Sequence, residues 1–80
     1  MKNREEIIKG IKDIILLNGS DMLSFNHRYG AVDPFITREV RLIGNDVYFV
    51  SNKCGMYPAS MVNMSYLTSL WNFIWINFSK

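Results

Sequence analysis

Residues 61–78, MVNMSYLTSLWNFIWINF, are the stretch around which this 80-residue chain is organised. They hold two Trp, two Phe and one Tyr, and no charged side chain occurs between Lys53 and Lys80. Their polar residues recur three or four positions apart, which places them on one face of a helix: Ser65, Thr68, Ser69 and Asn72. The pattern predicts a helix, with Tyr57-Pro58 as its start signal because proline suits the first helical turn.

The apolar arc of this predicted helix is much wider than the roughly 100° stripe that a surface helix needs. We expect an inward set against the protein's own sheet: Leu67, Leu70, Trp71 and Ile74. Phe73, Ile76 and Tyr66 are the expected outward set. Large aromatic residues dominate the energetics of interfaces. The predicted contact surface for a partner is therefore Tyr66, Phe73, Trp75, Ile76 and Phe78.

Two other interpretations of an uncharged, apolar segment concern membranes. A transmembrane helix needs about 20 apolar residues, and asparagine, serine and threonine interrupt this run repeatedly. An amphipathic helix at a membrane surface usually has a polar face rich in Lys and Arg, and this polar face has no charge. The sequence favours a core helix that packs on its own sheet and on a second copy or another protein.

The rest of the chain predicts one more helix and three strands. Residues 3–18 have an isoleucine stripe at helical spacing, with Asn3 and Glu6 in capping-box positions. Residues 22–29 alternate as a strand does, 35–51 form a hairpin, and 52–57 are a loop. The predicted fold is α+β, in the order α-β-β-β-α, with a three-stranded antiparallel meander and both helices on one face. Residues 1–80 are expected to form a single domain.

The hairpin has a definite predicted register. Gly44-Asn45 is a two-residue turn with glycine first, as a type II′ turn prefers. Folding about it pairs Leu42 with Val47, Val40 with Phe49, Arg41 with Tyr48, and Glu39 with Val50. Ile36 is expected on the same face as Val40 and Leu42, and Thr37 on the opposite face.

Composition limits the partners and the compartment. The formal net charge is +2, and the nine basic residues are scattered along the chain, so no block of charge indicates a polyanion partner. A single cysteine, Cys54, excludes an internal disulfide and favours a reducing compartment. The first residues lead into an amphipathic helix and lack the pattern of a signal peptide. The expected location is cytoplasmic, with no membrane span.

Residues that could carry chemistry are few. His27 and Cys54 form the one available pair of base and nucleophile, and nothing in their spacing places them together. The carboxylates fall on turns or on an exposed strand, and the glycines mark separate loops, so neither a metal cluster nor a phosphate loop is indicated. We therefore expect no enzyme activity, no metal and no cofactor.

Nucleic-acid binding is the alternative function. Basic and aromatic residues on the uncovered sheet face could stack on bases and neutralise phosphates: Arg28, Arg41, Tyr48 and Lys53. The element order is also that of the double-stranded RNA-binding domain, which is an analogy of topology alone. The basic cluster at the start of that family's second helix has no counterpart in residues 57–62. The leading expectation is a non-enzymatic interaction module that forms a homodimer or binds another protein; a chain without any ligand is the third reading.

Overall fold

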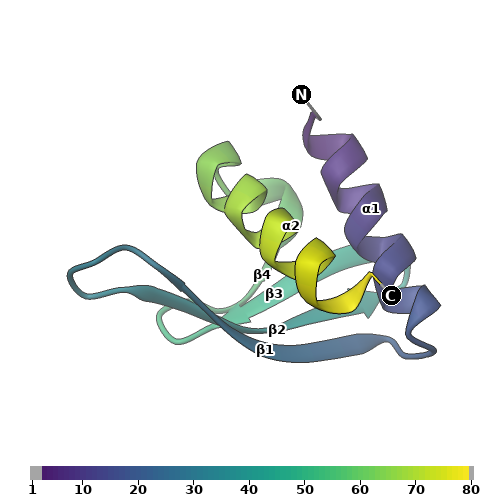
Figure 1. The fold of residues 1–80 in the computed structure, drawn as a ribbon, viewed down its shortest axis with the longest axis horizontal. Helices are drawn as coiled ribbons and strands as arrows, with labels where there is room; N and C mark the ends of the chain where they lie inside the picture. The colour runs from purple at the N-terminus through teal and green to yellow at the C-terminus, as the bar shows by residue number, and fades with distance from the viewer. Residues whose placement is uncertain (1–2, 80) are drawn as a thin grey trace.

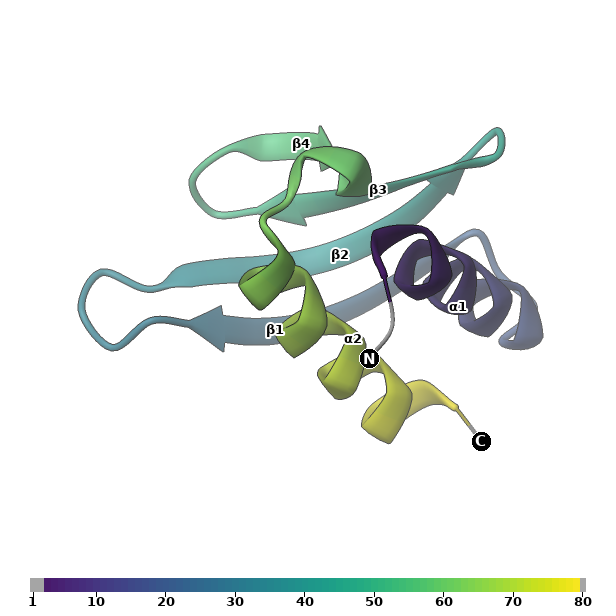
Figure 2. The ribbon, with the colours of Figure 1, turned by 90° about the horizontal axis from the view of Figure 1, so that it is seen from above.

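A computed structural model describes residues 3–79. Its elements are α1 (Arg4–Leu17), β1 (Met22–Tyr29), β2 (Phe35–Ile43), β3 (Asp46–Ser51), β4 (Gly55–Pro58), the 3₁₀ turn η1 (Ala59–Met61) and α2 (Met64–Phe78). The strands form one antiparallel sheet in the order β1-β2-β3-β4. Both helices lie on the same face of that sheet (Figures 1 and 2). The predicted α+β class is confirmed, and the number of strands is four rather than three.

The central hairpin has the predicted register. The structure pairs Leu42 with Val47, Val40 with Phe49, Arg41 with Tyr48, and Glu39 with Val50. Gly44 has a φ of 63°, which the first position of a type II′ turn requires and which glycine adopts without strain. The register is firm because a shift by one residue would expose Val40 and Phe49, which are fully buried.

The predicted faces of β2 are wrong at its first residues. Thr37 is fully buried with Val40, whereas Ile36 pairs with the exposed Arg28. The β2–β3 register shifts between Thr37 and Glu39. A β-bulge of this kind inserts one extra residue and reverses which side chains point inward beyond it. Simple alternation therefore fails across this one position.

The predicted loop over residues 52–57 contains a strand. Residues Gly55–Pro58 pair with β3: Gly55 lies opposite Ser51, and Pro58 lies opposite Tyr48. Pro58 lacks an N–H, which an edge strand tolerates because its outer side has no neighbour to bond. Tyr57-Pro58 is thus the end of β4 and not the start of the second helix.

The two helices begin at side-chain caps. In α1, Asn3 Oδ1 accepts from the Glu6 N–H at 2.8 Å, and Glu6 Oε1 accepts from the Asn3 N–H at 3.1 Å, which confirms the capping box. In α2, Asn63 Oδ1 accepts from the Tyr66 N–H at 2.9 Å. The second helix therefore starts at Met64, six residues after Pro58 of its predicted start signal.

The helices run in the same direction and touch along their length. The Arg4 guanidinium of α1 donates to the Val62 carbonyl just before α2, and Asn18 Nδ2 donates to the Phe78 carbonyl at 3.2 Å at the other end. Gly10 lies at the crossing, directly under the Trp71 ring. The core between the helices and the sheet is made of aliphatic side chains, one phenylalanine and one tyrosine, all at most 7% exposed: Ile7, Ile11, Ile14, Ile15, Leu23, Val40, Val47, Phe49, Ala59, Val62, Tyr66, Leu67, Leu70 and Ile74.

Candidate interaction site

Helix α2 hides some of its predicted contact residues and exposes others. Leu67, Leu70 and Ile74 are fully buried, and Trp71 packs half-buried against the core, which confirms their inward placement. Trp75 and Ile76 are 55% and 76% exposed.

Tyr66 was expected to face outward, and this is wrong, since it is only 7% exposed. Phe73 is also turned partly inward, because its ring lies 5.3 Å from that of Phe25 on β1. Phe78 contacts the same Phe25 ring, with centroids 6.1 Å apart. Strand β1 covers these rings of α2, because the side chains of Phe25, His27 and Tyr29 all point toward the helix.

The exposed apolar residues of the helix layer gather at one end of it. Leu16 and Leu17 are the last two residues of α1, 55% and 66% exposed, and Trp75 and Ile76 lie in the last turn of α2. The Asn18–Phe78 hydrogen bond holds these two helix ends together. We call these four residues the helix-end patch. Leu16 and Leu17 were not among the predicted contact residues, although they fall outside the isoleucine stripe of α1.

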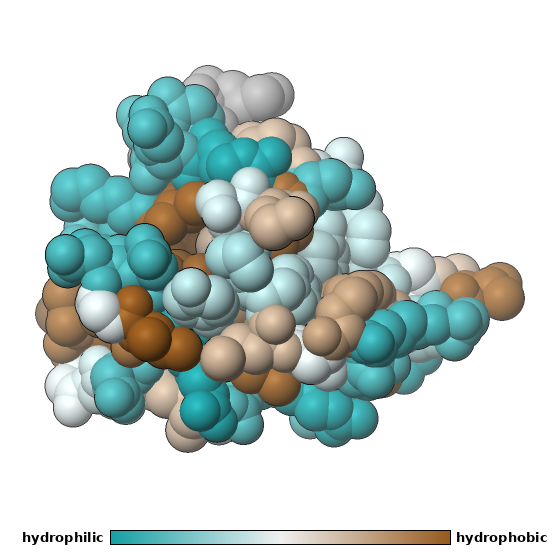
Figure 3. Space-filling view, turned by 180° about the vertical axis from the view of Figure 1, so that it is seen from behind, coloured by the Kyte–Doolittle hydropathy of each residue, from teal (hydrophilic) through white to brown (hydrophobic). Residues whose placement is uncertain are grey.

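Other exposed apolar side chains are dispersed. Seen from behind, hydrophobic residues form separate areas among hydrophilic ones, and the β1–β2 loop projects as an arm with hydrophobic side chains at its end (Figure 3). Val32 in that loop is 90% exposed, and Met56 and Met61 are 53% and 79% exposed. These three residues lie in the β1–β2 loop, β4 and η1, whereas the four residues of the helix-end patch lie at two helix ends that the Asn18–Phe78 hydrogen bond joins.

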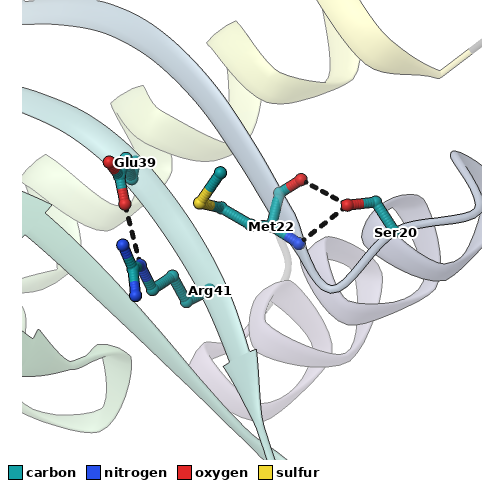
Figure 4. Close-up of polar contacts among 4 residues, drawn as sticks. All are labelled: Ser20, Met22, Glu39 and Arg41. Atoms are coloured by element: carbon teal, nitrogen blue, oxygen red, sulfur yellow. Dashed lines mark hydrogen bonds and ion pairs between the residues drawn. The ribbon is translucent and has the colours of Figure 1, made fainter.

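The proposed nucleic-acid residues are not brought together as a free basic surface. Arg41 and Tyr48 are cross-strand neighbours as predicted, but the Arg41 Nε is 2.8 Å from Glu39 Oε1. Figure 4 shows this ion pair on β2, with Met22 of β1 beside it. Lys53 Nζ lies 2.5 Å from Asp33 Oδ2. Two of the three cations therefore already have carboxylate partners.

Arg28 lies at the opposite end of the sheet from Arg41. Its partner on β2 is Ile36, whereas Arg41 pairs with Met22 at the start of β1. The open face between them also carries half-buried apolar side chains, among them Val50 and Ile36. A continuous track for a phosphate backbone would need unpaired cations in a row, and this arrangement does not supply one.

A buried polar cluster lies beneath α2. His27 Nε2 is hydrogen-bonded to Ser69 Oγ at 2.9 Å, and Thr37 and Ser51 are buried in the same part of the sheet. The His27 Nδ1 atom is buried without a hydrogen-bond partner among the described residues. Burial lowers the pKa of His27 below the usual 6.5, because an imidazolium there would lose its hydration.

Cys54 and His27 are held apart. Cys54 is an exposed residue in the β3–β4 turn, and His27 is buried on β1. His27, Thr37, Ser51 and Gly55 are successive partners across the four strands. Three strand spacings, about 14 Å, therefore separate His27 from Gly55, the residue next to Cys54. Within residues 3–79, no group of three His, Cys, Asp or Glu side chains is arranged to hold a metal ion.

The helices of the described region are also too short or too polar to cross a membrane. Comparisons of the chain with family models, with curated proteins and with solved structures find no significant match. Inferences about function therefore rest on the surfaces and cavities of this molecule.

Proposed function

We propose that this protein is a non-enzymatic interaction module that forms a homodimer through the helix-end patch. The observation that carries the proposal is the exposure of Trp75 and Ile76, at 55% and 76%, on a helix that has no charged side chain. Tryptophan is prominent among the residues that dominate binding energy in interfaces. Leu16 and Leu17 of α1 are exposed at the same end of the helix layer.

A second copy is the partner that the charge distribution favours. In a two-fold symmetric dimer each residue near the axis meets its own copy or a close neighbour, so a charged patch would repel itself. The helix-end patch consists of four uncharged side chains and avoids that repulsion. A chain of 80 residues also buries a smaller fraction of its surface than larger domains do, so association adds burial that one copy lacks. The proposal includes a cytoplasmic location, which the single, exposed cysteine supports.

Sedimentation of the purified protein over a range of concentrations tests this function. The measured mass should rise from the 9.3 kDa of one chain toward twice that value. Ile76→Glu should weaken dimerisation by about 100-fold, because two copies of the new charge are desolvated for each dimer formed.

The matched control is Ser60→Glu, which adds the same charge at an exposed position of η1, before the start of α2. This variant should dimerise as the wild type does. A wild-type protein that stays at the mass of one chain at every concentration would contradict self-association. Equal effects of the two variants would show that net charge, and not the patch, controls the mass.

A further inference from the structure

The imidazole of His27 on β1 is enclosed by side chains of α2. Its ring lies 5.9 Å from the Tyr66 ring and 5.4 Å from the Phe73 ring. Its Nε2 atom is hydrogen-bonded to Ser69 Oγ at 2.9 Å. The residue opposite it on β2 is Thr37, which is fully buried. The ring is therefore held between one helix and the neighbouring strand.

No carboxylate lies among these neighbours to compensate a positive charge on the imidazole. The Tyr66 hydroxyl is the one titratable group among them, and burial raises its pKa above the usual 10, so it stays neutral. Arg28, the next residue of β1, is exposed, and the alternation of the strand places it on the opposite face of the sheet.

A proton on the second ring nitrogen has no acceptor in this site. Both nitrogens of an imidazolium carry protons, and the Nδ1 atom of His27 is buried without a hydrogen-bond partner among the described residues. A buried charge without a partner is costly. The protonated ring therefore needs water, which reaches it when the enclosing side chains move away.

The contact between β1 and α2 is the one that can open to admit water. Strands β1 and β2 are joined by a backbone ladder. Helix α2 crosses above β1 (Figure 2) and rests on it through side chains, among them the ring pair Phe25 and Phe73. Opening of this contact breaks no ladder hydrogen bond, so it is a local event of the kind that folded proteins undergo.

A series of contacts leads from His27 to the helix-end patch. The Phe73 ring, which packs on His27, lies 5.3 Å from the Phe25 ring, and Phe25 lies 6.1 Å from Phe78. The Phe78 carbonyl accepts from Asn18 Nδ2 at 3.2 Å, and this bond joins the two helix ends. Separation of α2 from β1 therefore also separates the two halves of the helix-end patch.

We propose that His27 is a pH-sensitive switch, in which protonation releases the C-terminal half of α2 from β1 and weakens self-association. The effect on self-association rests on the proposed function, whereas the release of the helix does not. Enclosure lowers the pKa of His27, and an imidazole exposed to water returns to the usual 6.5. Proton binding therefore favours the open form as the pH falls below 6.5.

NMR of the wild type between about pH 7.5 and about pH 5.5, where carboxylates remain ionised, tests the release of the helix. The NOEs between the Phe25 and Phe73 rings should be lost as the His27 ring signals titrate. Amides in the last two turns of α2 should lose their protection from hydrogen exchange. Amides of the buried residues Val40 and Phe49 should keep theirs, because the sheet stays paired.

Two variants separate the switch from a merely structural role of the histidine. His27→Gln does not titrate, so its helix should stay on β1 throughout this pH range. Ser69→Asp keeps the histidine and places a carboxylate beside Nε2, which stabilises the imidazolium. The NOEs between Phe25 and Phe73 should then persist at about pH 5.5. This second variant keeps the test valid if glutamine does not fit the histidine site.

Sedimentation of the same proteins tests the effect on self-association. The dissociation constant of the wild-type dimer should rise as the pH falls over this range. The rise is limited to about 100-fold for each pH unit, because a dimer contains two copies of His27. The constant of the His27→Gln dimer should not change.

Three results would overturn the proposal. The first is persistence of the Phe25–Phe73 NOEs while the His27 signals titrate. The second is loss of protection in the sheet together with α2, which would show unfolding of the whole domain. The third is a dimer whose dissociation constant does not change while α2 is released. A wild type that is monomeric at about pH 7.5 contradicts the proposed function instead, and the NMR measurements then test the release of α2 in the single chain.

Discussion

At the scale of single residues, His27 couples stability to pH. Its ring is 7% exposed, packs against Tyr66 and Phe73 at centroid distances of 5.9 and 5.4 Å, and donates to or accepts from Ser69. The lowered pKa means that the unfolded chain binds a proton at a pH where the folded protein does not. Stability is therefore present above the unfolded value of 6.5 and falls as the pH drops from there toward the folded pKa.

We predict that the urea midpoint decreases between about pH 8 and about pH 5.5, a range in which carboxylates remain ionised. His27 is the single histidine of the chain, so it is the one side chain whose ordinary pKa lies inside this range. His27→Gln retains a hydrogen-bonding side chain toward Ser69 but does not titrate, and its midpoint should be independent of pH in the same range. A midpoint that increases on acidification of the wild type would show that the pKa is raised instead.

At the scale of secondary-structure elements, the contact between α1 and α2 depends on a glycine. A Cβ atom at Gly10 would lie 2.6 Å from Trp71 Cη2 and 2.8 Å from Cζ3, closer than carbon atoms approach. Glycine within a helix lowers stability by about 1 kcal/mol relative to alanine. Its presence at this position is explained by the close approach of the Trp71 ring.

We predict that Gly10→Ala lowers the free energy of unfolding by about 1 kcal/mol, because overpacking of about 1–3 kcal/mol exceeds the gain in helix propensity. In a Trp71→Leu background, which removes the obstructing ring, the same change should raise the free energy by up to about 1 kcal/mol. Urea unfolding of the four proteins in this double-mutant cycle measures the coupling. Stabilisation by Gly10→Ala in the wild-type background would contradict the close contact.

The same scale shows what could be predicted from the sequence. The isoleucine stripe of α1, its capping box and the Gly44-Asn45 turn are local patterns, and each appears in the structure where the pattern places it. The short strand β4 was missed because four residues ending in proline show no clear alternation, and its pairing partner β3 is what makes it a strand. The bulge after Thr37 is also set by pairing across strands and not by the local sequence.

The candidate surfaces were only partly predictable for a related reason. The excess of aromatic residues in α2 was evident, but the direction of each ring depends on which strand lies beneath it. Phe25 on β1 turns Phe73 and Phe78 inward, whereas Trp75 and Ile76 lie beyond the cover of the sheet. A cavity of about 410 Å³ is lined by residues from β1, β2, β4 and α2, among them Tyr29, Phe35, Tyr57 and Tyr66, so no single stretch of sequence indicates it.

At the scale of the whole molecule, the dependence on salt distinguishes apolar self-association from binding to nucleic acid. Arg41 and Lys53 are engaged with Glu39 and Asp33, and the helix-end patch has no charge. Dimerisation driven by apolar burial should change little when salt is added, whereas binding to nucleic acid weakens steeply with salt. A labelled duplex that binds at low salt and dissociates as salt increases would favour the nucleic-acid alternative.

The central claim is that Trp75 and Ile76 are covered by a second copy of the chain. The most direct measurement is an isotope-filtered NOE experiment on a mixture of ¹³C-labelled and unlabelled protein, which detects contacts between different copies alone. We predict NOEs from the Ile76 methyl protons of one copy to the Trp75 ring protons of the other. These NOEs should be lost in Ile76→Glu, where no methyl signal and no dimer remain. Samples at dimer-forming concentration that show NOEs between copies only at other surfaces, or none at all, would contradict it.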